Sequence, residues 1–386
     1  MPLLIVLLVL VGLNIWITRR IIGLGDAMGH KGMHIAMVWM VPLVGALMGH
    51  AQARAHEQAA RAELPVRNGV LDAPPALIEA PGAENWVMAH GLQLVHGYPL
   101  MDWRAFEAWL APLPPAAQPG LRLAAHRAWL LHMRDALGAH VSLRESEAAW
   151  VLSSLEPASA EAVAAYVART RGRIERVLGP LARFPAGMKS IVLVLDHEDD
   201  YYHYVAAHDP GEGEAAFSGG MFIDAGCPHF VLCRAELRDI EPVIAHELTH
   251  SALAHLRQPV WLDEGLAVNT EHRVAGARPS LHTPHALHAM HVRFWNEETI
   301  QQFWSGESFR RTDDGNLLSY DLARLVVSQL SSQWSVFQAF VADARRADAG
   351  EAAAARHFEL SLGRYVGALF GHQDADAWSP SALAGS

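Results

Sequence analysis

The stretch from Glu241 to Glu271, EPVIAHELTHSALAHLRQPVWLDEGLAVNTE, constrains this chain of 386 residues more than any other part. It contains the pentapeptide H-E-L-T-H at residues 246–250. Residues four apart on a helix lie on one face, so His246 and His250 can place two imidazoles on one metal ion. Glu247 lies beside them, where a carboxylate can accept a proton from an activated water molecule. The stretch therefore predicts a metal centre of the kind used for hydrolysis.

A third ligand is predicted in the segment W-L-D-E-G-L-A, residues 261–267, which follows a break at Pro259. Its carboxylate, Glu264, completes a set of two histidines and one glutamate and leaves a fourth position for water. His255 is a competing ligand, but the pattern H-E-x-x-H-x-x-G-x-x-H requires a glycine and a histidine where Leu253 and Leu256 stand. We therefore interpret His255 as an ordinary histidine near a helix C-terminus, where the helix dipole favours positive charge.

Glu271 lies seven residues beyond Glu264, two helical turns further along the same face. From there its carboxylate can orient one of the ligand histidines without touching the metal. The alternative, a solvated glutamate on a helix surface, is left open by the sequence.

At these residues the chain resembles the gluzincin zinc metallopeptidases, in particular the peptidase MA-like group, whose pattern is H-E-x-x-H followed by W-L-x-E-G-x-A. The resemblance covers residues 147–370 and implies a thermolysin-like catalytic domain. It also implies one Zn²⁺ per chain held by His246, His250 and Glu264, with Glu247 as the general base. Only 13 residues separate His250 from Glu264. Because this spacing is shorter than that of the zinc aminopeptidases, an aminopeptidase specificity is not implied.

The composition of the chain indicates which class of partner it can bind. Half of the residues are hydrophobic, so a sizeable core can form, and the formal net charge is −11 without a long basic run. Nucleic acid is therefore excluded as the expected partner. A peptide or protein substrate is expected instead, from the resemblance.

Two apolar segments open the chain, from Pro2 to Thr18 and from Met33 to Met48, each near the lower length limit for a membrane-spanning helix. They predict a two-helix hairpin in the membrane, with buried core helices as the alternative. The connection between them carries Arg19, Arg20 and Lys31, which places it in the cytoplasm by the positive-inside rule. We therefore expect an inner-membrane protein whose catalytic part faces the periplasm or exterior.

The remaining pattern predicts the domain order. Residues 1–50 hold the two membrane helices, 51–145 a stalk, a linker and a small helical region, 146–372 the metallopeptidase domain, and 373–386 a flexible tail. Within the catalytic part we expect strands at 149–152, 190–195, 218–223 and 229–232, with a helix over 157–178 after the first. The acidic run 196–200 lacks the spacing and glycine of a calcium loop, so it is interpreted as a solvated turn.

The only two cysteines, Cys227 and Cys233, flank the last of these strands. They are either a local disulfide or two thiols, and an extended strand would hold their Cα atoms too far apart for a disulfide without a bulge or turn.

Beyond the catalytic stretch, helices are expected over 317–330, 334–345 and roughly 352–370. Histidines recur every third residue at His282, His285, His288 and His291. Such a stripe can bind a metal or respond to pH, or it can be a solvated or cleft-lining face. Tyr320 begins the first of these helices. In the resembled aminopeptidases a tyrosine from the helical part stabilises the oxyanion, so Tyr320 is a catalytic candidate, with core packing as the alternative.

Together these features predict an α+β protein with a thermolysin-like domain, a small sheet followed by a helical half, behind an N-terminal membrane hairpin. The predicted function is that of a membrane-anchored zinc metallopeptidase. Two alternatives remain: a catalytically silent, membrane-tethered binding or scaffold protein on the same fold, and a zinc hydrolase whose substrate is not a peptide.

Overall fold

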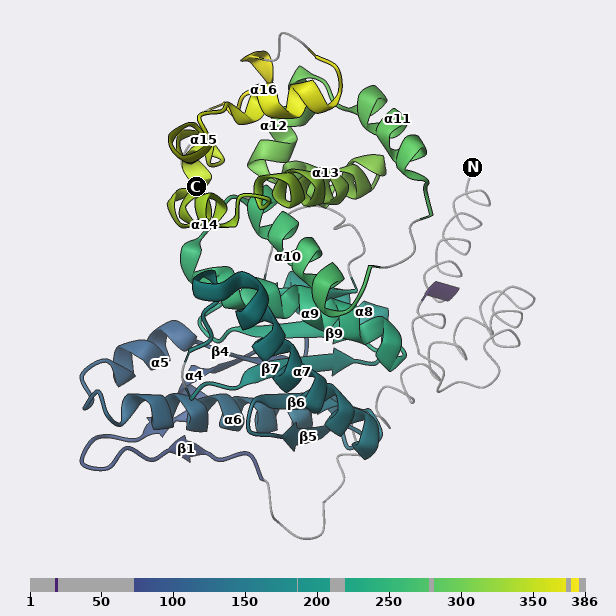
Figure 1. Cartoon of the computed structure of the whole chain (residues 1–386). Coiled ribbons are helices and arrows are strands. Elements are labelled where there is room, and N and C mark those ends of the chain that lie inside the picture. Colours follow the sequence, from purple (N-terminus) through teal and green to yellow (C-terminus); the bar gives the residue numbers. More distant parts are fainter. Residues whose placement is uncertain are drawn as a thin grey trace, which may run out of the picture.

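Most of the chain is described by a computed structural model, whose arrangement of helices and strands is shown in Figure 1. Helices hold 60% of the described residues, and the strands form one five-stranded sheet and two two-stranded sheets. The described residues are 18–19, 73–185, 187–208, 219–277, 281–372 and 376–381.

The predicted fold class, an α+β thermolysin-like domain behind a membrane hairpin, is wrong. The described part is mostly helical. Helices cover both faces of a small mixed sheet, and further helices follow the last strand in the sequence. Among the described residues, no helix combines the length and apolar character needed to cross a membrane. Nearly all of both apolar segments that suggested the hairpin falls in residues 1–17 and 20–72, outside the described residues.

The five-stranded sheet has the order β5-β6-β7-β9-β8. The three inner strands β6, β7 and β9 are parallel, and β5 and β8 run antiparallel at the two edges. Inner strands of this kind are covered on both faces, which explains their nearly continuous apolar runs. The four expected strands are confirmed as β6 to β9. The bounds are β5 Ser142–Glu145, β6 Ala149–Ser153, β7 Ser190–Leu195, β8 Gly220–Ile223 and β9 His229–Cys233.

Side chains that alternate along the inner strands divide the interior into two cores. Val151, Val192 and Phe230 face the first core, whereas Trp150 and Ile191 face the second. The first core is built by α7, by the helices that carry the candidate metal centre and by those that follow them; α10 to α16 lie above the sheet in Figure 1. The helices of this core are α7 Pro157–Leu178, α9 Leu237–Leu253, α10 Val260–Val274, α11 Pro284–Phe294, α12 Glu297–Ser305, α13 Asp314–Leu330, α14 Trp334–Asp343, α15 Glu351–Phe358 and α16 Leu362–Leu369.

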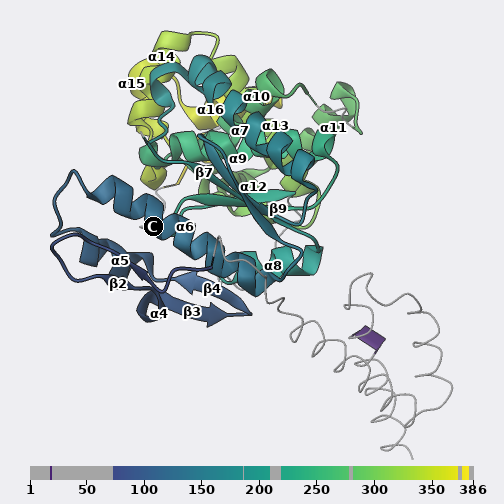
Figure 2. The same ribbon diagram turned by 90° about the horizontal axis from the view of Figure 1, so that it is seen from below.

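The second core lies under the opposite face of the sheet, where the N-terminal elements gather (Figure 2). We call β1 to β4 with α4 to α6 the N-terminal layer. This layer occupies the described part of the range expected to be stalk, linker and small helical region, and its core residues are continuous with those of the sheet. Its elements are β1 Leu77–Ile78, β2 Trp86–Val87, α4 Met88–Gly91, β3 Leu92–Val95, β4 Tyr98–Met101, α5 Trp103–Leu110 and α6 Gln118–Leu137, and α8 Glu198–Ala206 adjoins it.

Three local predictions differ from the structure. The acidic run expected to be a solvated turn enters α8, whose first turn holds three of its carboxylates at the positive end of the helix dipole. The single helix expected over 352–370 is two helices, because Glu359 takes a left-handed conformation (φ 55°) and Ser361 caps α16 by accepting from the Arg364 N–H. Residues 376–381 of the expected flexible tail are packed, since Trp378 is buried and its carbonyl accepts from the Trp304 indole.

Candidate metal centre

The candidate metal centre lies between α9 and α10, which form a tight helical hairpin. Apolar residues of α9 such as Ile244 and Leu248 are buried in the first core, and this fixes the opposite face, with His246 and His250, toward α10. After α9 the chain reverses through a short 3₁₀ turn that ends at Arg257, which has a left-handed conformation (φ 52°), and Pro259 precedes α10.

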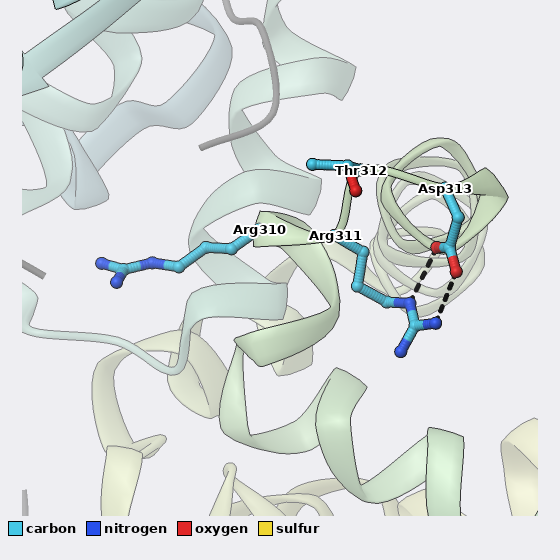
Figure 3. Close-up of a pocket in the computed structure, with 4 residues that line it drawn as sticks. All are labelled: Arg310, Arg311, Thr312 and Asp313. Carbon is cyan, nitrogen blue, oxygen red and sulfur yellow. Dashed lines mark hydrogen bonds and ion pairs between the residues drawn. The ribbon is translucent and has the colours of Figure 1, made fainter. Parts of the chain in front are cut away.

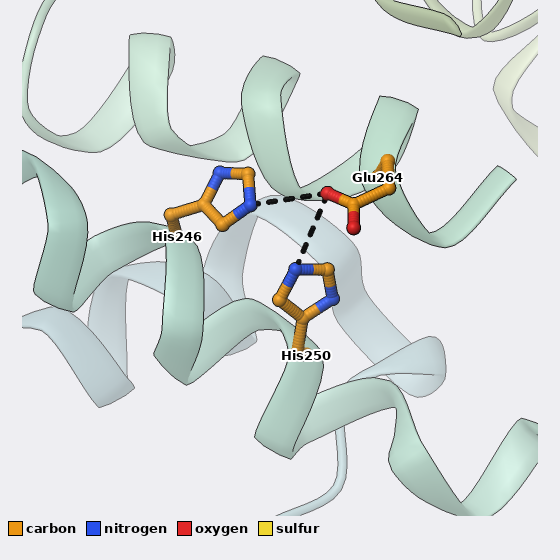
Figure 4. Close-up of side chains that lie close together, drawn as sticks. All are labelled: His246, His250 and Glu264. Carbon is orange, nitrogen blue, oxygen red and sulfur yellow. Dashed lines mark hydrogen bonds and ion pairs between the residues drawn. The ribbon is translucent and has the colours of Figure 1, made fainter. Parts of the chain in front are cut away.

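His246, His250 and Glu264 converge at this hairpin, as Figure 4 shows. The Nε2 atoms of His246 and His250 lie 3.2 and 3.5 Å from the same Glu264 oxygen, and the two rings are 4.8 Å apart between centroids. One ligand atom from each residue lies within 4.8 Å of the others, and within the described residues no other group of this kind is found. The three residues predicted as ligands could therefore hold one metal ion.

Each histidine is held from behind by a carboxylate. Nδ1 of His246 lies 3.2 Å from Glu271, and Nδ1 of His250 lies 2.9 Å from Asp263. A carboxylate only accepts, so it draws the proton to Nδ1 and leaves Nε2 with a free lone pair for a metal. The sequence left open whether Glu271 has this role or is a solvated glutamate, and its contact with His246 and its burial favour the first. Asp263 was not predicted in this role, although its position next to Glu264 in the sequence is a signal for it.

Without a metal these carboxylates favour protonated imidazoles. Burial lowers the pKa of His246, but hydrogen bonds with Glu264 and Glu271 outweigh it and raise the pKa to about 9. Burial also acts on His250, but the charges of Asp263 and Glu264 raise its pKa well above the usual value. The same contacts outweigh burial at Glu264 and lower its pKa. A metal ion that binds here therefore has to displace protons.

Glu247 is buried beside the ligands, with 5% of its surface exposed. Burial raises the pKa of its carboxyl group, and the charges of His246 and His250 oppose this. The backbone N–H of Phe222 in the edge strand β8 also opposes the rise. A carboxyl group whose pKa is raised toward neutrality is suited to accept and return a proton.

Tyr320 of α13 faces this cluster. Its ring centroid lies 6.4 Å from that of His246, and Phe309 packs edge-on against its other side at 5.1 Å. The charge of Glu264, followed by burial and the charge of Glu247, raises the pKa of the Tyr320 hydroxyl well above its usual value. The hydroxyl is therefore protonated at neutral pH and remains a hydrogen-bond donor, which either of its predicted roles permits.

Close contact between α10 and α13 sets the place of Glu264. A Cβ atom on Gly265 would lie 2.6 Å from both the Ala323 carbonyl oxygen and the Val327 side chain. Nδ2 of Asn269 also joins the two helices, because it donates to the carbonyls of Gly265 and Arg324. The glycine after the ligand glutamate is thus required by helix packing.

The other candidate residues lie apart from the cluster. His255 is in a short 3₁₀ turn after α9 and does not join the group of ligands. Of the histidine stripe, His285 and His288 are exposed on α11, but His291 is buried: its Nδ1 accepts from the Trp295 indole, and its Nε2 lies 3.0 Å from Asp321. The stripe is therefore not one solvated face, because His291 anchors α11 to α13. Cys227 and Cys233 are free thiols.

A separate shallow pocket of about 370 Å³ lies at the start of α13 (Figure 3). Arg311 points to Asp313, with Nε 2.8 Å from Oδ1, and also donates to Gln302. Hydrogen bonds from Arg311 lower the pKa of Asp313 to about 2. This arginine is already paired, so the pocket offers no chemistry comparable with the cluster.

Comparison with known proteins assigns neither a family nor a function to this chain. No protein-family model matches this chain, and neither a curated protein nor a solved structure matches it.

Proposed function

We propose that this protein is a zinc-dependent hydrolase that cleaves peptide bonds. The observation that carries the proposal is the convergence of His246, His250 and Glu264 with the buried Glu247 beside them. The likeness of the motif to that of the gluzincins supports the same reaction.

Zinc fits this set of donors better than Ca²⁺ or Mg²⁺. Two imidazoles and one carboxylate with a position left for water are a usual catalytic zinc set, whereas Ca²⁺ and Mg²⁺ take oxygen ligands. Two ligand atoms bound at about 2.0–2.1 Å in a tetrahedral site are about 3.3 Å apart. The separations of 3.2 and 3.5 Å between the imidazole Nε2 atoms and the Glu264 oxygen match this value.

The roles of the side chains follow from their positions. A bound zinc ion supplies Lewis acidity, which lowers the pKa of water and polarises a carbonyl group. Glu247 accepts the proton of the attacking water and returns it to the leaving amine. Tyr320 donates a hydrogen bond to the oxyanion that develops on the scissile carbonyl.

A peptide is the favoured substrate because an edge strand borders the site. β8 pairs only with β9 among the described strands, and its Phe222 amide faces Glu247. An extended peptide can add to the open edge of such a strand through main-chain hydrogen bonds, which place its carbonyls in order along the site.

The test compares Glu247→Gln with His250→Ala. The amide of glutamine cannot accept a proton, so Glu247→Gln keeps stoichiometric zinc but cleaves an unfolded protein substrate about 10² to 10⁴ times more slowly. His250→Ala loses both zinc and cleavage. Zinc content is measured by metal analysis of purified protein, and His285→Ala, on exposed α11, is the matched control that changes neither.

Each result has a definite reading. Full cleavage by Glu247→Gln removes the proposed mechanism, and stoichiometric zinc in His250→Ala removes the ligand assignment. A wild-type protein that binds zinc without cleaving any peptide favours the scaffold or non-peptide alternatives instead.

A further inference from the structure

The second core contains histidines that the proposed reaction does not use. His126 of α6 is 4% exposed and His229 of β9 is 2% exposed, and both lie where the N-terminal layer meets the sheet. His208, at the end of α8, places its ring 5.5 Å from that of His229. Imidazoles from three elements therefore meet in an otherwise apolar interior.

The hydrogen bonds of His229 are satisfied by a neutral ring. Its Nδ1 lies 2.7 Å from the Cys227 carbonyl, which only accepts, so Nδ1 carries the proton. Its Nε2 lies 2.8 Å from the Tyr204 hydroxyl, which then donates to it. A second proton on Nε2 would require the Tyr204 hydroxyl to turn its own proton away and accept instead, and Trp129 packs against the ring at 5.2 Å.

His126 has even less support for a charge. Its Nδ1 is buried and has no hydrogen-bond partner among the described residues, and the Trp103 ring packs edge-on against it at 5.1 Å. The charged groups that act on it are Glu107 of α5 and Arg122 of its own helix. These two already form a bidentate pair with each other, at 2.6 and 2.7 Å, so their charges largely cancel at the imidazole.

The other groups that face the two rings do not favour protonation either. Next to His229 are Tyr204 and His208 from α8, and Tyr98 of β4 packs against Tyr204 at 5.2 Å between ring centroids. No carboxylate forms a hydrogen bond or ion pair with either histidine within the described residues. Burial lowers the pKa of His126 to about 4 and that of His229 to about 3.

We propose that His126 and His229 form a proton-operated latch, which holds the N-terminal layer on the sheet at neutral pH and releases it in acid. Both rings take up protons only when the layer opens and water reaches them. Opening of the layer also frees one end of β9, where His229 is paired with Ile223 of β8, next to the Phe222 amide that faces Glu247. Acid therefore loosens the strand that borders the candidate metal centre without a change in its ligands.

The size of the effect follows from proton linkage. A histidine with an ordinary pKa near 6.5 in the open state, but neutral when closed, raises the opening equilibrium constant about 20- to 25-fold between pH 7 and pH 5. Two such histidines raise it about 500-fold. The sign is fixed: the open state binds more protons, so the closed state loses stability as the pH falls below about 6.5.

Amide hydrogen exchange of the full-length protein tests the latch. We expect protection of α6 to fall about 500-fold from pH 7 to pH 5, after correction for the intrinsic rate, while protection of α13 changes much less. His126→Phe keeps the aromatic contact with Trp103 and removes one titrating group, so its response falls to about 20-fold. His285→Phe, exposed on α11, is the matched control and responds as wild type.

Two outcomes overturn the proposal. One is equal acceleration of α6 and α13 in the wild-type protein, a measurement that does not depend on any variant folding. The other is a full 500-fold response in His126→Phe, or in His126→Leu if the phenylalanine variant does not fold. A smaller response in either variant, confined to the N-terminal layer, supports the latch.

Discussion

Two pairs of histidines lie on opposite sides of the same sheet and have opposite preferences for a proton. His246 and His250 have carboxylate oxygens at 3.2 and 2.9 Å from Nδ1, and their pKa values are raised. His126 and His229 are surrounded by aromatic rings, a hydroxyl and a carbonyl, and their pKa values are lowered. The residue type is the same in both pairs, so the neighbouring groups determine whether the imidazole favours the charged or the neutral form.

The comparison shows what makes a buried histidine available to a ligand. A carboxylate behind Nδ1 leaves Nε2 of each site histidine directed toward Glu264 and free to bind a metal. In His229 both nitrogens are occupied by partners within the fold, so nothing is left for a ligand. In a chain with 23 histidines, the presence of an imidazole says little about metal binding. The hydrogen-bond partners of its two nitrogens show better whether one nitrogen is free to bind a metal.

Removal of the Asp263 and Glu271 carboxylates is expected to have the largest effect, a loss of metal affinity. Without them, His246 and His250 lack a charged partner at Nδ1, as His126 and His229 do. Loss of one such partner costs about 10- to 100-fold in metal affinity, so Asp263→Asn with Glu271→Gln should cost about 10² to 10⁴. Competition with a chromophoric chelator measures this. Asp343→Asn is the matched control, because Asp343 pairs with His357 at 2.8 Å outside the cluster and its loss should leave zinc affinity unchanged. An unchanged affinity in the double variant would show that the carboxylates do not orient the ligands.

Tyr320→Phe gives the next largest effect and separates the two roles of that residue. An oxyanion donor is worth about 10² to 10³ in kcat, so the variant should lose that much while it retains zinc and stability. Rates on a peptide substrate, zinc content and urea unfolding measure the three quantities. If kcat stays the same and only the free energy of unfolding falls, Tyr320 is a packing residue.

The smallest expected effect lies on the other side of the sheet. Tyr204→Phe removes the hydroxyl that donates to His229, and an unsatisfied buried acceptor costs about 1–3 kcal/mol of unfolding free energy. Urea unfolding at pH 7 measures this loss, and zinc affinity should not change. Tyr365→Phe is the control, because its hydroxyl bonds Gln329 at an exposed position. Equal losses in the two variants would mean that the hydrogen bond from Tyr204 to His229 stabilises the fold no more than an exposed hydrogen bond does.

The group of residues that could hold a metal was predictable because it depends on local geometry. His246 and His250 lie four residues apart on one helix, and helical periodicity alone brings them together. Asp263 could not be assigned in the same way. It and Glu264 are neighbours in the sequence and point about 100° apart on the helix, and only the position of α9 shows that His250 reaches both.

Other errors arise from contacts between distant parts of the chain. His291 belongs to a regular stripe in the sequence, but Asp321 lies 30 residues away and pairs with it only in the folded protein. The fold class is wrong for the same reason, because the helices that dominate the described residues cover the sheet through tertiary packing, which a motif does not encode. The break before α16 was readable, since Ser361 is a good helix cap. Location at the inner membrane, with the site facing outward, stays a prediction, because it depends on residues outside the described part.

The contact at Gly265 has a consequence for mutational scanning of this protein. The backbone of α10 lies against the Ala323 carbonyl and the Val327 side chain of α13 there, so a larger side chain at Val327 would push the two helices apart and move Glu264 away from the histidines. Such a substitution changes no candidate ligand, but it would score as a loss of metal. A mutational scan would therefore find positions along α13, as well as in the motif, at which substitutions reduce metal binding. These positions would identify α13 as the helix that supports the candidate third ligand.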